Sequence, residues 1–579
     1  MKKRFSYIGV LTPLFVAGSI ALAGCTDSDY DLGDLDKTIA VGSEEGITLS
    51  GSSTSNITLD DLLDIDDSDC ITTEDNGDYV FVKEGDQVTA NPNIDQIDVT
   101  QQTSVDIPQK INVGTLPSTY SMIPVGTTLT GTGGQIAEDI NTFDYEGGKP
   151  TEVVDLTEVT VDGNVTLTIS FNSDLQSFLS TFTSFDIEFP SYMTIENTTN
   201  GTISGNAIQF GTVPTDKPLT FTADVTKLKF ETVDAANLLA IDGSNIKMKG
   251  NVRVKATYPD LVKGSGDITN MIINAQTNLS DIKITGAKGK FNPEIDIDDS
   301  SFDVTDVPDF LNDPDVNINI FDPQITLQVN SNVGVDAFVD ATLTAYFKNG
   351  TSKSVDVAGI SIPGNKNSKI LVCRQPKTEP YGDYTQVKTV DNLSDLIQTI
   401  PEKITFKANA YADQTKEGEF KLGYNGYNIT TDYEFKAKLE LEAGSTIVYN
   451  DTVDGWAEDL EDLLLHDNAK VEATFDITNN VPAKLDLEAT PIDANGKDIA
   501  ANMLKIENPS TIGTGVTKGV KFTITQQNKD ALKKLDGLRV KVKAISTGNT
   551  PLNKTSQTIK IENITVTVKG KVVFEDNDD

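Results

Sequence analysis

Hydrophobic and polar residues alternate strictly in several parts of the chain. Residues 165–171 read Val-Thr-Leu-Thr-Ile-Ser-Phe, and residues 433–441 alternate hydrophobic with charged side chains. Because successive side chains of a β-strand point to opposite faces, this period of two predicts strands with one buried and one exposed face. Such strands are typical of antiparallel sheets. The same alternation recurs at 471–477, 538–544 and 559–568.

Turn signals separate these stretches. Asn-Gly pairs favour two-residue hairpin turns, because both residues tolerate a positive φ. They occur at Asn76-Gly77, Asn200-Gly201, Asn349-Gly350, Asn425-Gly426 and Asn495-Gly496. Helical spacing is confined to short segments such as 175–182 and 393–397. The pattern predicts an all-β protein of tandem antiparallel β-sandwich modules, Ig-like or Greek-key in type, with a few short helices.

The length of the chain sets the expected number of modules. At roughly 100–200 residues per domain, a chain of 579 residues holds three to five. Joints rich in Gly, Pro or Asp lie near residues 146, 310 and 401. The predicted ranges are a signal segment at 1–24, an acidic tether at 25–52, an N-terminal β module at 53–145, and β-sandwich modules at 146–310, 311–400 and 401–579.

The N-terminus has the layout of a secretory signal peptide. Three basic residues at 2–4 precede an apolar run from Ile8 to Ala23. That run is shorter than the ~20 residues that span a bilayer. No later stretch reaches that length without charges, so the sequence predicts no transmembrane helix.

The signal ends in Leu22-Ala23-Gly24-Cys25, which resembles the lipobox of bacterial lipoproteins. The resemblance implies cleavage between Gly24 and Cys25. It also implies a diacylglyceryl group on the Cys25 thiol and a fatty acyl group such as palmitate on the new amine. Two or more chains give stable membrane anchoring. The alternative is an ordinary secretory signal in which the cysteine is incidental.

The residues after Cys25 suggest where the anchored body faces. The acidic stretch 26–36 resembles the export signals of surface lipoproteins of Bacteroidota, which implies display on the outside of the outer membrane. The alternatives are a solvated tether and a body on the periplasmic face. Residues 76–81 and 492–496 also resemble uncharacterised β-rich surface lipoproteins of Bacteroidota. That resemblance supplies no activity.

Charge narrows the classes of partner. The formal net charge is -40, with 87 Asp and Glu against 47 Lys and Arg. A field of that sign repels nucleic acid and anionic lipid headgroups, so we expect no nucleic-acid partner. The expected contact with the membrane is through the N-terminal acyl chains.

Nothing in the sequence forms a catalytic motif. His466 is the only histidine, and its place at the end of an acidic, leucine-rich segment needs no catalytic explanation. Paired carboxylates could hydrolyse glycosides, but the many acidic residues include no pattern that singles out two. We therefore expect that the protein is not an enzyme, and no catalytic residue is assigned.

Metal and disulfide candidates are weak. Asp296, Asp298 and Asp299 are candidate ligands of a structural Ca²⁺, since calcium prefers carboxylate oxygens, but they match no spaced calcium loop. No other cofactor is expected. After lipidation Cys70 and Cys373 remain, and they could form a disulfide or stay as two buried thiols.

Three aromatic residues are candidates for a glycan-binding platform. Tyr424 and Tyr427 flank the Asn425-Gly426 turn, and Trp456 is the only tryptophan. Exposed aromatic rings stack on sugars, but aromatic residues in β-proteins are more often cross-strand pairs or core. Both interpretations stay open.

Together these observations predict a lipid-anchored binding, structural or adhesion protein on the surface of the outer membrane. Its glycan or protein ligand is not specified by the sequence. The alternative is a carbohydrate-binding or carbohydrate-processing surface lipoprotein resembling glycoside hydrolases.

Overall fold

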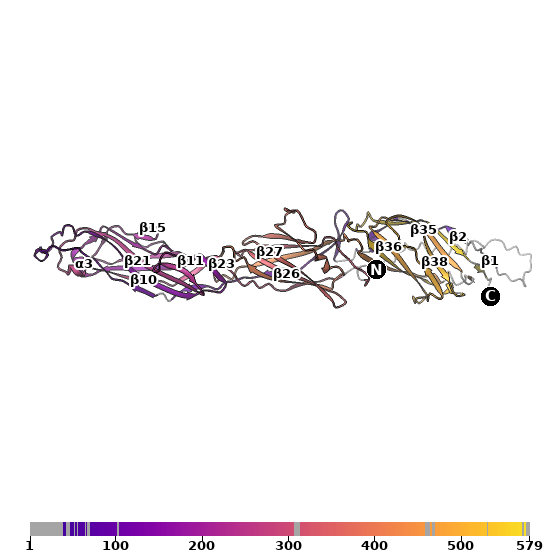
Figure 1. Cartoon of the computed structure of the whole chain (residues 1–579), viewed down its shortest axis with the longest axis horizontal. Coiled ribbons are helices and arrows are strands. Elements are labelled where there is room, and N and C mark those ends of the chain that lie inside the picture. The colour runs from indigo at the N-terminus through magenta and orange to yellow at the C-terminus, as the bar shows by residue number, and fades with distance from the viewer. Residues whose placement is uncertain are drawn as a thin grey trace, which may run out of the picture.

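The computed structural model describes residues 39–41, 47–50, 53–54, 56–63, 65, 70–100, 103–305, 313–457, 464–465, 469–529, 531–569 and 572–574. These residues form three β-sandwiches that lie end to end in an elongated rod (Figure 1). The predicted all-β fold is confirmed. The predicted alternation is visible in the strands: in Ala337–Tyr346, buried and partly buried side chains alternate through nearly the whole strand.

The first sandwich forms the end of the rod that carries α3 (Ser173–Phe178) in Figure 1. One sheet contains β8 (Thr103–Asp106), β10 (Gly134–Gly148), β13 (Ser184–Glu188), β15 (Thr202–Ser204), β16 (Ala207–Gln209), β19 (Glu231–Thr232), β20 (Leu238–Asp242) and β21 (Asn245–Tyr258). The other contains β7 (Ile97–Val99), β9 (Gln109–Lys110), β11 (Val153–Phe171), β14 (Met193–Glu196), β18 (Leu219–Lys229), β22 (Ile272–Leu279), β23 (Ile282–Phe291) and β31 (Gly418–Phe420). The short pair β12 (Thr181–Phe182) and β17 (Val213–Pro214) lies apart from both sheets.

Asn172 explains why α3 begins where it does. Its side chain accepts a hydrogen bond from the Leu175 amide at 3.0 Å, which satisfies one of the amides that a helix start leaves unpaired. The spacing of 175–182 predicts a helix here; the helix ends at Phe178, and Thr181–Phe182 form the strand β12 instead. Leu175 and Phe178 are the buried residues of α3, and they pack into the core at the end of the sandwich.

The second sandwich occupies the middle of the rod. One sheet contains β24 (Ser300–Asp303), β26 (Ala337–Tyr346), β27 (Ser352–Ile362) and β30 (Lys403–Ala412). The other contains β4 (Ile71–Thr73), β5 (Tyr79–Glu84), β6 (Val88–Ala90), β25 (Gln324–Ser331), β28 (Ser368–Cys373), β29 (Gln386–Thr389) and β32 (Ile429–Lys438). The β28–β29 pair is parallel, in contrast to the antiparallel pairing of the other strands in these sheets.

The third sandwich pairs a large sheet with a small one. The six-stranded sheet contains β2 (Ile47–Ser50), β3 (Ile57–Thr58), β35 (Lys470–Asn479), β37 (Leu504–Glu507), β38 (Gly515–Gln526) and β40 (Thr558–Lys569). The three-stranded sheet contains β33 (Thr446–Val453), β36 (Ala483–Ile492) and β39 (Gly537–Ser546). A further sheet at the end of the rod joins β1 (Ile39–Val41), β34 (Leu464–Leu465) and β41 (Val572–Phe574).

The helical segments are short. The α-helix α2 (Leu59–Leu63) follows β3 directly. Four single 3-10 turns are η1 (Tyr120–Met122), η2 (Ile268–Asn270), η3 (Leu393–Leu396) and η4 (Leu532–Lys534). In the described part of the chain, no helix is long and apolar enough to cross a membrane.

The chain passes twice through the second and third sandwiches, in a nested order around the first. It begins in the third sandwich, where β2 and β3 pair with β40, and continues into the second, where β5 and β6 pair with β32. Residues 97–291 then build most of the first sandwich. The chain returns through the second sandwich with β24–β32 and ends in the third with β33–β41. Both ends of the described chain therefore lie in or beside the third sandwich.

This nesting differs from the module ranges that the sequence predicts. The predicted module at 53–145 has no sheet of its own among the described residues, because its strands are shared among all three sandwiches. The predicted range 401–579 likewise includes strands of the second sandwich, β30 and β32. Alternation reveals which side chains face inward, but it does not reveal which distant strand is the hydrogen-bonding partner.

The junction between the first and second sandwiches is held by β31 and an aromatic cluster. The segment 413–428 leaves the second sandwich, and its strand β31 pairs with β23 of the first. Phe420 of β31 is buried between Phe291, at a ring-centroid distance of 5.7 Å, and Tyr427, at 4.4 Å. The two sandwiches thus share one continuous hydrophobic core.

The junction between the second and third sandwiches is held by backbone hydrogen bonds. The Tyr79 amide donates to the Leu552 carbonyl at 2.9 Å, and the Leu552 amide donates to the Leu439 carbonyl at 3.0 Å. Beside them, Glu74 forms ion pairs with Lys436 and Lys438 at 2.8 and 2.6 Å. Hydrogen bonds from these two lysines hold the pKa of the Glu74 carboxyl below its usual value.

Candidate functional site: an apolar cavity in the third sandwich

The predicted lipidation site lies outside the described residues. Gly24 and Cys25 precede the first described residue, Ile39, so the structure contains no geometry for them. The lipobox assignment therefore stays a prediction from the sequence.

The calcium candidates form the polar face of an extended segment. Asp296, Asp298 and Asp299 are exposed, whereas the neighbouring Ile295 and Ile297 turn toward the core. Asp299 forms an ion pair with Lys407 at 2.6 Å. Within the described ranges, no three acidic, cysteine or histidine side chains are grouped to hold a metal ion. Exposure to solvent on one side of this extended segment explains these acids.

The three aromatic candidates do not form one platform. Tyr427 is buried at the first junction, where its hydroxyl accepts a hydrogen bond from the Lys421 amide at 2.8 Å and burial raises its pKa. Tyr424 is 43% exposed and packs edge-on against Tyr427. Trp456 is buried in the core of the third sandwich. Two of the three side chains are therefore core residues, and only the Tyr424 ring is accessible to a sugar.

The sheet keeps the two described cysteines apart. Cys70 lies just before β4, and Cys373 lies on β28, with β5, β32 and β25 between them. Four strand spacings of about 4.8 Å place them roughly 19 Å apart, whereas a disulfide needs Cα atoms within about 7 Å. Both are buried thiols. Burial raises the pKa of the Cys373 thiol, which makes it a poor nucleophile.

The most prominent internal feature is a cavity between the two sheets of the third sandwich. Its volume is about 310 Å³. By comparison, two cavities in the second sandwich measure about 20 and 40 Å³, and one in the first measures about 10 Å³. Its walls are almost entirely aliphatic and aromatic side chains from both sheets. They include Ile477, Leu485, Ile512, Leu538, Val542 and Ile561.

Small inward-facing side chains, and two sheets with different numbers of strands, explain why side chains do not fill this space. Ala473 of β35, Ala489 of β36 and Ala544 of β39 line the cavity at inward-facing positions, where larger residues would fill it. The surrounding buried residues separate into two clusters. One includes Trp456 and Leu535, and the other includes Ile477 and Leu485. The cavity lies between these clusters.

The polar groups of the cavity belong to the edges of the two sheets. Tyr449 and Asp451 lie on β33, the edge strand of the small sheet, and the Tyr449 hydroxyl donates to an Asp451 carboxylate oxygen at 3.3 Å. Thr54 lies in the segment between the edge strands β2 and β3 of the large sheet. The cavity thus has almost wholly apolar walls, with three polar residues beside its margin.

The size of the cavity carries an energetic cost. At about 24 cal/mol per Å³ of empty volume, an unfilled space of this size would cost roughly 7 kcal/mol. That is comparable with the whole folding stability of many domains. An apolar ligand that fills the space would recover much of this cost.

The pattern of residues along the chain does not by itself reveal this cavity. Alternation in 471–477 and 538–544 predicts which residues face inward, and the alanines at 473 and 544 are visible in it. Nothing local to either strand indicates that these alanines face the same space. The one signal in the sequence is that several strands carry a small residue at an inward-facing position. It indicates a cavity only when those strands are known to be neighbours.

Comparisons with known proteins give little more. No protein-family model matches the chain, and no curated protein matches it significantly. Among solved structures, the chain is similar to a "putative secreted protein" from Parabacteroides distasonis, at 16% identity and a TM-score of 0.37. The similarity covers 49% of this chain and 90% of that one. A likeness this distant carries no argument about function. Fold and site define the class: an elongated all-β protein of stacked sandwiches, one of which encloses an apolar cavity.

Proposed function

We propose that this protein is a lipid-anchored rod of the outer membrane that acts by binding or as a structural part of the cell surface, without catalysis. The observation that carries the proposal is the nested topology. Ile39 of β1 pairs with Phe574 of β41, so both ends of the described chain meet at one end of the rod. An anchor at the N-terminus would attach at that end and leave the first sandwich farthest from the membrane.

The length of the proposed tether is compatible with this arrangement. Cys25 precedes Ile39 by 14 residues, which span at most about 50 Å when fully extended. The acidic side chains of this tether would repel anionic headgroups and favour a body that stands away from the bilayer.

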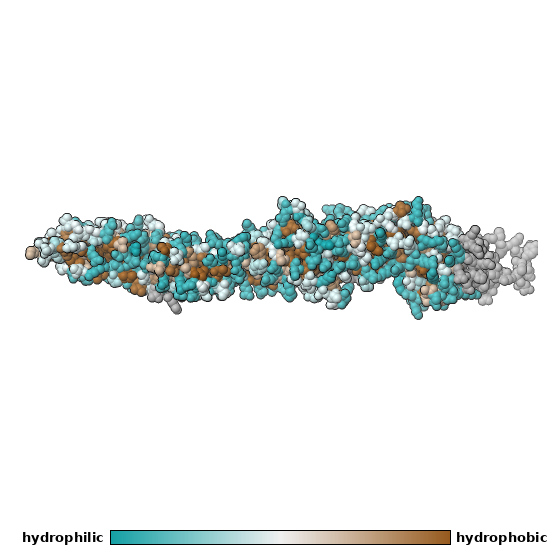
Figure 2. Space-filling model, in the orientation of Figure 1, coloured by the Kyte–Doolittle hydropathy of each residue, from teal (hydrophilic) through white to brown (hydrophobic). Residues whose placement is uncertain are grey.

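The far end of the rod has features of a contact surface. Residues 111–133 form a long loop between β9 and β10 that contains η1. Met122 is 81% exposed and Val125 is 68% exposed. Figure 2 shows a largely hydrophilic face on which hydrophobic residues form small scattered groups, one of them at this tip. Exposed apolar residues on a long loop are typical of interaction sites.

The anchor is tested by metabolic labelling with an alkyne analogue of palmitate. The wild type should incorporate the label and Cys25→Ala should not. Cys373→Ala is the matched control and should label like the wild type, because its thiol is buried in the second sandwich. Label that persists on Cys25→Ala would refute the proposed anchor.

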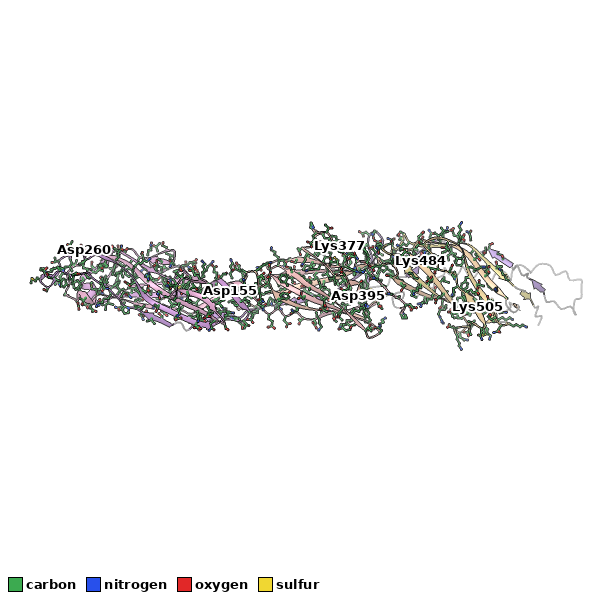
Figure 3. The ribbon with its side chains drawn as sticks, in the orientation of Figure 1. Asp155, Asp260, Lys377, Asp395, Lys484 and Lys505 are labelled. Atoms are coloured by element: carbon green, nitrogen blue, oxygen red, sulfur yellow. The ribbon has the colours of Figure 1, made fainter. Side chains whose placement is uncertain are left out.

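The orientation is tested with a membrane-impermeant maleimide on intact cells. Thr127→Cys places an exposed thiol on the loop 111–133. Lys505→Cys places one on the third sandwich, where Figure 3 labels Lys505. The remaining cysteines of the body are buried and give little background. Surface display predicts labelling of both variants on intact cells. Labelling only after the outer membrane is opened would place the rod in the periplasm and exclude adhesion.

A further inference from the structure

We propose that the cavity of the third sandwich is a binding site for the hydrocarbon chain of a lipid with an uncharged headgroup. The inference rests on the cavity itself and does not depend on how the protein is anchored. No contact at the distal tip is involved.

The cavity matches a hydrocarbon chain in volume and in shape. An engineered apolar cavity of about 150 Å³ stays dry and binds benzene. The present cavity is about twice that size, at about 310 Å³. It extends between two sheets, from Leu485 toward the second sandwich to Leu538 near the end of the rod. A long narrow molecule without polar groups along its length fits such a space.

The apolar walls exclude polar occupants. The walls offer side chains of isoleucine, leucine, valine, phenylalanine and alanine, which cannot form hydrogen bonds. A sugar, or a polypeptide strand with its amides and carbonyls, would lose hydrogen bonds to water and gain none inside. A hydrocarbon chain has no hydrogen bonds to water to lose, and it gains the burial of its apolar surface.

The charge of the residues beside the cavity disfavours an anionic headgroup. The polar residues beside the cavity are Asp451, Tyr449 and Thr54, and the Tyr449 hydroxyl donates to the Asp451 carboxylate. A carboxylate or phosphate placed there would face Asp451 and a chain with a formal net charge of -40. A hydroxyl or ester headgroup avoids this repulsion, and a hydroxyl can donate a hydrogen bond to Asp451. The site therefore favours neutral lipids such as fatty alcohols and monoacylglycerols over fatty acids.

The binding experiment uses the whole mature chain with Cys25→Ala, so that no covalent acyl chain competes. The neutral fluorophore N-phenyl-1-naphthylamine is the probe, and straight-chain alcohols displace it. Because each buried methylene contributes about 0.8 kcal/mol, affinity should rise roughly fourfold per added carbon until the cavity is full. The fatty acid of equal length should displace the probe less well. Probe binding that does not saturate, or that ignores chain length, overturns the proposal.

Matched core substitutions locate the site. Ala544→Leu adds volume inside the cavity, and Ala341→Leu adds the same volume in the second sandwich, beside a cavity of about 20 Å³. Ala544→Leu should abolish probe binding and keep or raise the melting temperature. Ala341→Leu should lower the melting temperature and leave probe binding unchanged, provided that it folds.

A second cavity-filling variant keeps the experiment decisive if Ala544→Leu does not fold. Ala489→Leu lines the same cavity from β36, and circular dichroism shows whether each variant is folded. Loss of probe binding in a folded filling variant supports the proposal. Undiminished binding in a folded Ala544→Leu or Ala489→Leu protein would show that the probe binds elsewhere, and would overturn it.

Discussion

At the scale of single residues, Gly289 is a position where the fold requires the absence of a side chain. It lies on β23 opposite a bulged part of β11, where the register shifts between Val153 and Asp155 and again between Leu156 and Glu158. A Cβ atom at Gly289 would lie 2.1 Å from the Asp155 carbonyl oxygen. Figure 3 places Asp155 toward the second sandwich, near the first junction.

Gly289→Ala should therefore destabilise the first sandwich by about 1–3 kcal/mol, the usual range for overpacking. The matched control is Gly286→Ala on the same strand, where the nearest atom to an added Cβ is 3.7 Å away. Alanine restricts the unfolded chain more than glycine does, so the control should be neutral or slightly stabilising. Chemical denaturation measures both. Equal effects of the two substitutions would contradict the close approach of the β11 backbone.

At the scale of secondary structure elements, β31 connects two sandwiches through one buried ring. Phe420 is 2% exposed and contacts Phe291 of the first sandwich and Tyr427 at the start of the second. Each sandwich retains its own paired strands without this contact. The contact thus holds the two bodies in a fixed orientation more than it holds either one together.

Phe420→Ala should cost about 3–5 kcal/mol locally, as is typical when a buried phenylalanine is truncated. We expect faster hydrogen exchange and proteolysis in 413–428, with little change in the strands of the third sandwich. Tyr424→Ala in the same loop is the control, because Tyr424 is 43% exposed. It should change stability by less than about 0.5 kcal/mol. Uniform protection of 413–428 in Phe420→Ala would contradict the proposed role of the junction.

At the scale of the whole molecule, the nested topology produces a rod in which Ile39 and Phe574, the first and last described residues, lie at the same end. A compact globular chain of 579 residues would have a radius of gyration of roughly 25 Å. Small-angle X-ray scattering of the mature chain should give a clearly larger value and a pair-distance distribution with a long tail. A symmetric distribution with a radius near the compact value would show that the sandwiches fold back on one another in solution.

The nested order of the strands also determines which sandwich can complete its sheets first. The first sandwich is built mostly from the continuous stretch 97–291, whereas the third needs β2 and β40, which are more than 500 residues apart in sequence. Closing such a long loop costs more entropy than a local contact does. The first sandwich can therefore complete its sheets before the third, which must wait for the C-terminal strands.

The sequence by itself determined the fold class, through signals that are local. Alternation at 165–171 predicts the inward residues of β11 correctly, and Val165, Leu167, Ile169 and Phe171 are all buried. The Asn-Gly pairs lie at turns, as Asn349-Gly350 does, although only the glycine adopts a positive φ there. The predicted helical segment 175–182 is helical over Ser173–Phe178, whereas Thr181–Phe182 form the strand β12. The lipobox is local too, and it stays a prediction from the sequence.

Only the tertiary structure decided the partners of each strand, the burial of each aromatic residue and the existence of the cavity. Tyr424 and Tyr427 look equivalent in sequence, but one lies at the surface and the other fills a junction. Ala473, Ala489 and Ala544 line one cavity only when the sheet that contains β35 faces the sheet that contains β36 and β39. The physical reason is that strand pairing and packing join residues far apart in the chain, and alternation within one strand contains no information about its neighbours.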